Sequence, residues 1–113
     1  MRLLFKIVPA SLWAEAEASG VFTGSPVDHR DGFIHLSAAH QVRETAARHF
    51  AGQDGLLLAA FTEDALEAVA WEPSRGGDLF PHVHGTIPVS AALWVKPLAL
   101  RDGVHQFPGE AGA

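Results

Sequence analysis

The sequence predicts a single α+β domain over residues 1–113, and three observations lead to this fold class. A chain of 113 residues is of the length that usually builds one hydrophobic core. Its composition, 48% hydrophobic and 19% charged, is typical of a globular protein. Short apolar runs with strand character outnumber the helical stretches, which come early. This order favours a bent mixed β-sheet with two main helices against it.

The first predicted elements are a strand and a helix. Residues 2–8 form an apolar run that ends at Pro9, as expected of a buried strand. Ser11 can cap a helix that ends at Gly20, because glycine commonly follows the last helical turn. The face of this helix that we expect to be buried carries Leu12, Trp13 and Ala16.

A second strand and helix are predicted after a loop over residues 20–32. Residues 32–37 have strand character, and Ser37 can cap a helix over 38–50. The expected buried face of that helix carries Ala39, Val42, Ala46 and Phe50. Residues 28–31 are charged and are most simply a solvated turn, although one of them could reach a site next to His35.

The second half of the chain is predicted to be mostly strands. Residues 56–61 are apolar on both faces and are expected to form the central strand. Further strands are predicted over residues 69–72, 82–87 and 92–96. We expect an ordered core over about residues 2–100 and a short, irregular C-terminal tail.

Charge and composition exclude several classes of partner. Eight Lys and Arg against thirteen Asp and Glu give a formal charge of −5, which argues against a nucleic-acid partner. No apolar run reaches the roughly 20 residues of a membrane helix, and the charged start followed by Pro9 does not fit a signal peptide. We therefore expect a cytoplasmic protein without a membrane partner. The chain has no Cys and no Tyr but seven His, so polar chemistry must use imidazole, carboxylate, hydroxyl or basic groups.

The first candidate site lies at the end of the predicted strand 32–37. Alternation along a strand places His35 and Ser37 on the same face, where an imidazole and a hydroxyl can hold a ribose or an amide. The following helix N-terminus would add backbone N–H groups suited to an anion. The alternative is that Ser37 only caps the helix and His35 is a half-buried residue with its own hydrogen bonds.

A second pair of histidines occurs in the predicted strand 82–87. His82 and His84 share a face by the same alternation, and with His35 they could form a three-histidine metal site. No carboxylate stands at a familiar metal-ligand offset, so we expect no metal. The alternative is two exposed strand histidines without a role.

The third candidate is the segment 71–78, in which Pro73, Gly76 and Gly77 predict an unusual loop. Arg75 in this loop could bind an anion. Glu72, beside Trp71, could act as an acid or base of raised pKa. A Glu72–Arg75 pair that only stabilises the loop is an equally good interpretation.

Long blocks of the sequence resemble a small bacterial family known as domain of unknown function 952. The blocks are residues 5–8, 20–28, 31–37, 46–50, 71–77 and 80–95, which include GFIHLS and WEPSRGG. The resemblance covers nearly the whole chain, from Leu4 to about Leu98.

The block Phe33-Ile34-His35-Leu36-Ser37 also resembles, more distantly, the ADP-ribosyltransferase superfamily, in particular the RNA 2'-phosphotransferases. The resemblance implies an ADP-ribosyltransferase-like fold, with His35 and Ser37 in a cleft that holds NAD. Lys6 stands where the superfamily's first strand usually has a histidine. No acid stands near His82 and His84, where the superfamily often has a catalytic glutamate.

These observations lead to one leading expectation and two alternatives. The leading expectation is a cleft for a small nucleotide-like ligand, with NAD as the implied cofactor and an NAD-utilising transferase or hydrolase as the implied enzyme. His35, Glu72 and His84 are then the candidate catalytic residues, and the candidate ligand-binding residues are Lys6, Ser37, Arg75 and His82. The alternatives are a binding or interaction module without catalysis on the same fold, and a histidine-based metal-dependent enzyme.

Overall fold

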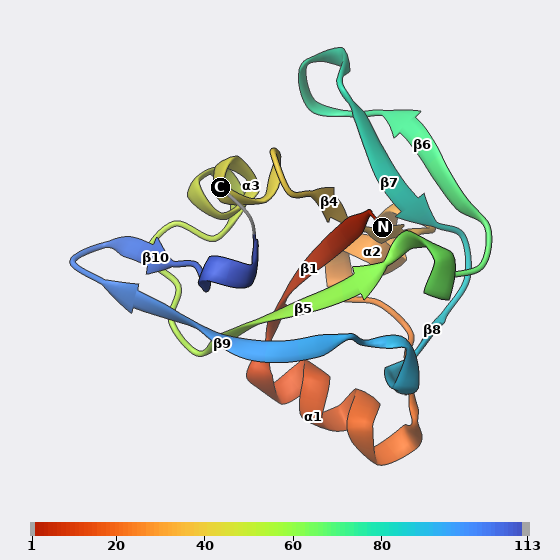
Figure 1. Ribbon diagram of the computed structural model, residues 1–113, viewed down its shortest axis with the longest axis horizontal. Helices are drawn as coiled ribbons and strands as arrows, with labels where there is room; N and C mark the ends of the chain where they lie inside the picture. The colour runs from red at the N-terminus through yellow and green to blue at the C-terminus, as the bar shows by residue number, and fades with distance from the viewer. Residues whose placement is uncertain (1, 112–113) are drawn as a thin grey trace.

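The computed structural model describes residues 2–111, except for the side chain of Arg75. Within these residues three α-helices accompany the strands (Figure 1). The helices are α1 (Ala10–Ser19), α2 (Pro26–Asp31) and α3 (Val42–His49). The strands are β1 (Leu3–Pro9), β2 (Val21–Phe22), β3 (Ile34–His35), β4 (Ser37–Ala38), β5 (Leu56–Thr62), β6 (Val69–Pro73), β7 (Leu79–Val83), β8 (Ile87–Pro88), β9 (Trp94–Arg101) and β10 (Val104–Gln106).

The strands form a curled antiparallel sheet of five strands and two smaller sheets. The five-stranded sheet has the order β10-β9-β5-β1-β4, the three-stranded sheet the order β3-β7-β6, and β2 pairs with β8. Every pairing among the described strands is antiparallel. The predicted α+β class is therefore confirmed, but the prediction of a mixed sheet is wrong.

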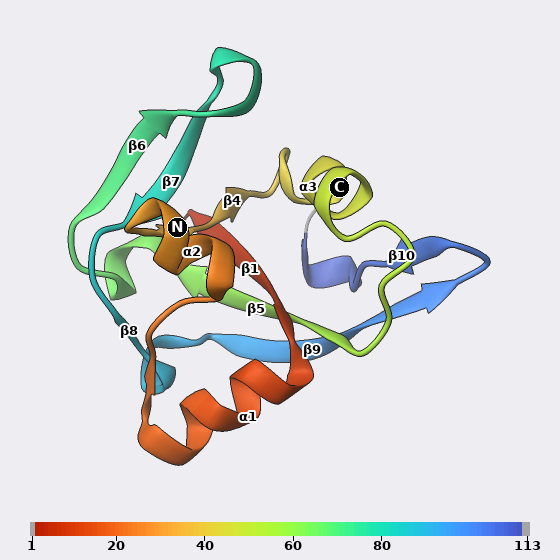
Figure 2. The ribbon, with the colours of Figure 1, turned by 180° about the vertical axis from the view of Figure 1, so that it is seen from behind.

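The two faces of the five-stranded sheet carry separate cores. Along β1, Leu4 and Val8 pack into one cluster with Trp13 of α1, and Phe5 packs into the other with Val42 of α3. Strand alternation explains this division, because neighbouring residues of β1 point to opposite faces. Figures 1 and 2 accordingly show α1 and α3 on opposite sides of the sheet. The central strand β5 is buried on both faces, as predicted for residues 56–61.

Helix α1 matches its prediction more closely than α3 does, but the prediction of Ser11 as its cap is wrong, because the helix begins at Ala10 after Pro9. Trp13 and Ala16 are buried, and Gly20 ends the helix with a φ of 88°. The prediction of a helix over 38–50 capped by Ser37 is wrong, because Ser37 belongs to β4 and α3 begins at Val42. The Gln41 side chain explains the delayed start, since it accepts from Ala38 N at 2.9 Å and donates to Leu79 O at 2.8 Å.

Helix α2 lies where the sequence predicts a loop. Ser25 and Asp28 form a capping box, in which Asp28 Oδ2 accepts from the backbone N–H of Ser25 at 2.8 Å. Pro26 occupies the first turn, and Gly32 ends the helix with a φ of 88°. The interpretation of residues 28–31 as a solvated turn is wrong for Asp28, which is buried.

Several strands differ from their predicted extents. The predicted strand 32–37 is divided between two sheets as β3 and β4, with Leu36 N donating to Pro81 O between them. Strand β7 starts and ends earlier than predicted, and β9 continues through Pro97 to Arg101. The expected irregular tail instead continues as β10, which pairs with the last residues of β9 and buries His105.

Strands β6 and β7 form a hairpin that extends beyond the rest of the fold (Figure 1). The base of the hairpin pairs with β3 through Ile34–Val83 and His35–His82. This pairing brings β3 together with the predicted histidine strand. No helix within residues 2–111 is long and apolar enough to cross a membrane.

Candidate functional site

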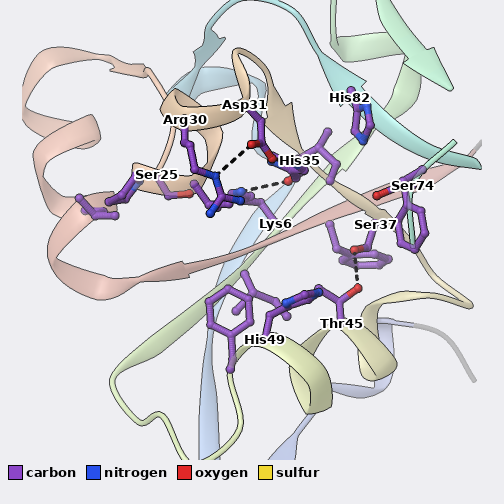
Figure 3. A pocket seen from close by; sticks show the side chains of 18 of the residues that line it. Lys6, Ser25, Arg30, Asp31, His35, Ser37, Thr45, His49, Ser74 and His82 are labelled. Atoms are coloured by element: carbon purple, nitrogen blue, oxygen red, sulfur yellow. Dashed lines mark hydrogen bonds and ion pairs between the residues drawn. The ribbon is translucent and has the colours of Figure 1, made fainter. Parts of the chain in front are cut away.

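A cavity of about 520 Å³ lies beside the free edge of β1. Strand β4 pairs with β1 at Leu4 and Phe5, and beyond this pairing Lys6 and Ile7 both line the cavity. Figure 3 shows Lys6, Asp31 and His35 on one side of the cavity and Thr45 and His49 of α3 on the other. Most of the exposed cavity surface is apolar, and several polar and charged side chains also line it.

Buried Asp28 joins three segments of the chain at the cavity wall. Its carboxylate accepts from Lys6 Nζ at 2.9 and 3.1 Å and from His35 Nδ1 at 2.7 Å. It also accepts from the backbone N–H groups of His35 and Ser25. Lys6 Nζ donates in addition to the carbonyl oxygen of His35 at 3.0 Å. The network therefore fixes β1, α2 and β3 relative to one another.

The contacts of this network shift the pKa values of Asp28 and Lys6. Burial by itself raises the pKa of Asp28, but the hydrogen bond from His35 and the charge of Lys6 outweigh it and hold this pKa well below its usual value. Burial lowers the pKa of Lys6, and the attraction of Asp28 opposes that change. Because its ammonium is already paired with Asp28, Lys6 contributes little net charge to a ligand in the cavity.

The His35 ring lies between two carboxylates of α2. Its Nδ1 is 2.7 Å from Asp28 Oδ1, and its Nε2 is 3.0 Å from Asp31 Oδ2. The two contacts hold the ring between α2 residues on both of its nitrogens. His35 is thus held tightly in the cavity wall, and its role as a site residue stays a prediction.

His82 and Glu72 form a second histidine–carboxylate pair. His82 Nδ1 donates to Glu72 Oε1 at 2.7 Å, and the same oxygen accepts from the exposed His84 at 2.8 Å. His82 is only 2% exposed, and its Nε2 is buried without a hydrogen-bond partner in the part of the chain that the structure describes. His82 lines the cavity. A buried polar atom left unpaired costs about 1–3 kcal/mol, so this nitrogen calls for an explanation.

The environment of His82 keeps its ring neutral near pH 7. Burial lowers the pKa of His82, the hydrogen bond to Glu72 raises it, and the charges of His35 and His84 lower it further; the net shift is downward. The expectation of a raised Glu72 pKa is wrong, because hydrogen bonds, first from His84 and then from His82, lower this pKa. Since Nδ1 carries the hydrogen that Glu72 accepts, Nε2 of the neutral ring presents a lone pair.

Phe33 packs against all three histidines of the site. Its ring is stacked on His82 with a centroid distance of 4.1 Å and an interplanar angle of 29°. The ring centroids of His35 and His84 lie 4.6 and 5.1 Å away. The Phe33 ring therefore restricts the orientation of His82.

The structure brings four of the seven predicted site residues to the cavity wall: Lys6, His35, Ser37 and His82. Ser37 lies 3.2 Å from Thr45, oxygen to oxygen. Glu72 and His84 reach the site through their contacts with His82 and Phe33. The side chain of Arg75 lies outside the described residues.

Sequence reasoning included Asp28 only among the charged residues 28–31, of which one could reach the site, and it missed Phe33. The signal for Asp28 was its position three residues after Ser25, with Pro26 between them and Gly32 beyond, which is the pattern of a short capped helix. Phe33 carried no comparable signal, because an aromatic residue at a strand start is usually core. The histidines of the site bond to carboxylates, and no group of three or more metal-ligating side chains arranged to hold an ion occurs in residues 2–111.

Gly24, before α2, is a position at which the site depends on a glycine. Its φ is 112°, and an added Cβ would lie 3.0 Å from Asp28 Cβ and 3.1 Å from His29 Cδ2. We expect Gly24→Ala to lower the free energy of unfolding by about 2–4 kcal/mol in urea titration, because it adds a clash to a strained backbone. Gly52→Ala is the control, since Gly52 also has a positive φ (74°) but open space around it, and should cost about 1 kcal/mol. Equal losses would contradict the role of the close contact with Asp28.

Comparison with known proteins identifies relatives over nearly the full chain. The family model described as protein of unknown function (DUF952) matches residues 7–95. A crystal structure of protein CC0527 from Caulobacter crescentus is similar with a TM-score of 0.90 and 45% identity, covering 96% of this chain and 97% of that chain. A solution NMR structure of CC0527 has a TM-score of 0.86 and 46% identity, covering 98% of this chain and 97% of that one. None of the curated proteins matches the chain.

Proposed function

The chain belongs to the DUF952 family, and on this premise we propose that its cavity binds a small nucleotide-class ligand, with NAD and ADP-ribose as the candidates. The observation that carries the proposal is His82, a buried residue of the cavity lining whose Nε2 has no hydrogen-bond partner within the described residues. A lone pair in such a position is satisfied by a ligand that donates a hydrogen bond, and a ribose hydroxyl is such a donor.

The remaining lining supports the same class of ligand. The cavity of about 520 Å³ falls within the range of small-molecule sites. Its apolar wall, with Phe50 and Phe80, suits a flat heterocyclic ring. Arg30 lines the cavity with an exposed side chain that is available to a phosphate group, although it also contacts Asp31. The distant resemblance of residues 33–37 to the ADP-ribosyltransferase superfamily adds NAD as the first ligand to test.

The test is a calorimetric titration with NAD, ADP-ribose, AMP and adenosine. We expect at least one of them to bind to the wild type, and His82→Phe to weaken that ligand at least about tenfold by removing the acceptor nitrogen. The phenyl ring retains the shape that stacks on Phe33, so a thermal melt should show a folded variant.

His40→Phe is the matched control, because His40 is exposed and lies outside the cavity lining. Its affinities should equal those of the wild type. The absence of binding by all four ligands to the wild type would overturn the proposal. Equal affinity in His82→Phe and the wild type would overturn the role of Nε2.

A further inference from the structure

Strand β1 directs the backbone N–H and C=O of Ile7 away from its neighbour β5. In an antiparallel pair, hydrogen-bonded residues alternate along each strand with residues whose backbone groups point to the other side. Glu63 N donates to Arg2 O at 2.9 Å at one end of the β1–β5 pairing. Ala10 N donates to Gly55 O at 2.9 Å at the other end. The even-numbered residues of β1 therefore bond to β5, and the odd-numbered Ile7 does not.

The side of Ile7 that points away from β5 lies at the cavity. Strand β4 pairs with β1 only at Leu4 and Phe5, and Ile7, beyond that pairing, lines the cavity. Within residues 2–111, neither a strand nor a loop supplies a backbone partner on this side of Ile7. Pro9 is the next residue of β1 on the same edge, and a strand accepts proline where its nitrogen faces no partner strand.

The backbone of Ile7 is a buried donor and acceptor in need of a partner. Ile7 is only 5% exposed, and a buried backbone N–H or C=O without a hydrogen bond is costly. In a sheet, the N–H and C=O of one such residue exchange two hydrogen bonds with a single residue opposite. A ligand replaces that residue if it presents an acceptor and a donor side by side.

The charged groups of the same wall are already bonded to one another. The three hydrogens of the Lys6 ammonium are matched by three acceptor contacts, two to Asp28 oxygens and one to His35 O. Both ring nitrogens of His35 contact carboxylates. The neutral backbone of Ile7 is therefore better placed than Lys6 or His35 to form new hydrogen bonds with a ligand.

We propose that the backbone of Ile7 binds the adenine ring of the nucleotide ligand. The N–H of Ile7 donates to a ring nitrogen of adenine, and its C=O accepts from the exocyclic amino group beside that nitrogen. This inference rests on the proposed function, because it needs a nucleotide in the cavity. It adds which part of the nucleotide the free edge of β1 recognises.

The cavity surface favours adenine over the pyridinium ring of NAD at this position. Most of the exposed surface is apolar, and Phe50 and Phe80 contribute to it. A neutral heterocycle of two fused rings buries more apolar area there than a single ring does. The pyridinium ring carries a fixed positive charge, whose transfer to an apolar surface is costly.

The first test is a calorimetric titration of the wild type with AMP, purine riboside 5'-monophosphate and nicotinamide mononucleotide. Purine riboside 5'-monophosphate differs from AMP only by the missing amino group, so the comparison isolates the bond to Ile7 O. We expect this loss to weaken binding at least about tenfold, because the carbonyl stays buried without a partner. Nicotinamide mononucleotide should also bind more weakly than AMP.

The second test follows the amide protons of β1 by NMR during a titration of isotope-labelled protein with AMP. A new hydrogen bond should move the Ile7 amide proton downfield. Val8 is the control within the same strand, because its N–H points to β5 and already has a partner. Its amide proton should move less than that of Ile7.

A proline substitution removes the proposed donor itself. Ile7→Pro should weaken AMP at least about tenfold, and a thermal melt checks that the variant is folded. Leu3→Pro is the matched control, because Leu3 is another odd-numbered residue of β1 but lies outside the cavity lining. AMP should bind to Leu3→Pro as it binds to the wild type. The NMR measurement tests the role of Ile7 in the wild type even if Ile7→Pro does not fold.

The outcomes distinguish the inference from the proposed function. Equal affinity for AMP and purine riboside 5'-monophosphate would overturn recognition of the amino group and leave nucleotide binding intact. Tighter binding of nicotinamide mononucleotide than of AMP would overturn the choice of adenine. An Ile7 amide proton that moves no more than that of Val8 would overturn the assignment of Ile7. Failure of every nucleotide to bind would overturn the proposed function, and the inference with it.

Discussion

Asp28→Asn is expected to lower the free energy of unfolding by about 3–5 kcal/mol, which is a large part of the stability of a small domain. The substitution preserves the shape of the side chain but leaves the buried ammonium of Lys6 without its counter-charge. It also weakens the bond to the His35 ring, so that α2 and β3 lose their shared anchor. Urea unfolding at pH 7, followed by tryptophan fluorescence, measures the loss.

A second substitution tests whether the uncompensated charge is the cause. Adding Lys6→Met to Asp28→Asn removes the charge that lacks a partner, so the double variant should recover at least about 1 kcal/mol relative to Asp28→Asn alone. A further loss in the double variant would show that Asp28 acts mainly through its backbone hydrogen bonds to Ser25 and His35 and not through Lys6.

Acid should weaken the wild type for the same reason. The Asp28 pKa is lower in the folded than in the unfolded chain, so its contribution is complete above the unfolded value of about 4. That contribution is lost progressively as the pH falls below this value, because the folded state must then take up a proton. The unfolding curve of Asp28→Asn should show a correspondingly smaller dependence on pH in this range.

Trp13→Ala is expected to cost about 3–5 kcal/mol through the loss of a large, fully buried side chain. Trp13 is 2% exposed, packs with Leu4, Val8 and Phe22, and docks α1 on the sheet. The substitution leaves a cavity between helix and sheet that the surrounding backbone cannot close. The midpoint of urea unfolding should fall while the slope of the transition stays the same.

Trp71→Ala provides the matched control at a partly exposed tryptophan. The Trp71 ring contacts the Arg2 guanidinium, and its Nε1 donates to Glu63 at 3.0 Å. Loss of these contacts and of its partial packing against the core cluster should cost about 1–2 kcal/mol. A loss as large as that of Trp13→Ala would mean that the β6–β7 hairpin contributes as much to the core as α1 does.

Local sequence patterns were sufficient to predict the elements whose buried side chains follow from residue spacing along the chain. The apolar run 56–61 became the central strand because no polar side chain interrupts it, and Trp13 and Ala16 share a face of α1 because of helical spacing. Two predictions failed, one because of a distant side-chain bond and one because of strand pairing near the C-terminus. Gln41 reaches Leu79 and delays the start of α3, and residues 104–106 extend the sheet by pairing with β9.

The candidate site was predicted only in part, because several of its contacts join segments that are distant in the sequence. His35 and His82 belong to distinctive blocks, and the sequence indicated a shared cleft for both. Their direct pairing across β3 and β7 requires the β6–β7 hairpin to fold back on β3. Nothing in the sequence around Lys6 indicates that its charge would be paired with Asp28, 22 residues away.

The amino-acid sequence by itself determined the α+β class, the central strand, the first helix, and the four residues Lys6, His35, Ser37 and His82 that line the cavity. Strand alternation and helical spacing act over a few residues, so they can be read along the chain. The tertiary structure alone decided that the sheet is antiparallel, that Asp28 neutralises Lys6, and that His82 has one nitrogen on Glu72 and the other buried without a partner in the described residues. These features depend on contacts between segments distant in sequence, and the energy of a buried charge or polar atom depends on the partner that folding brings to it.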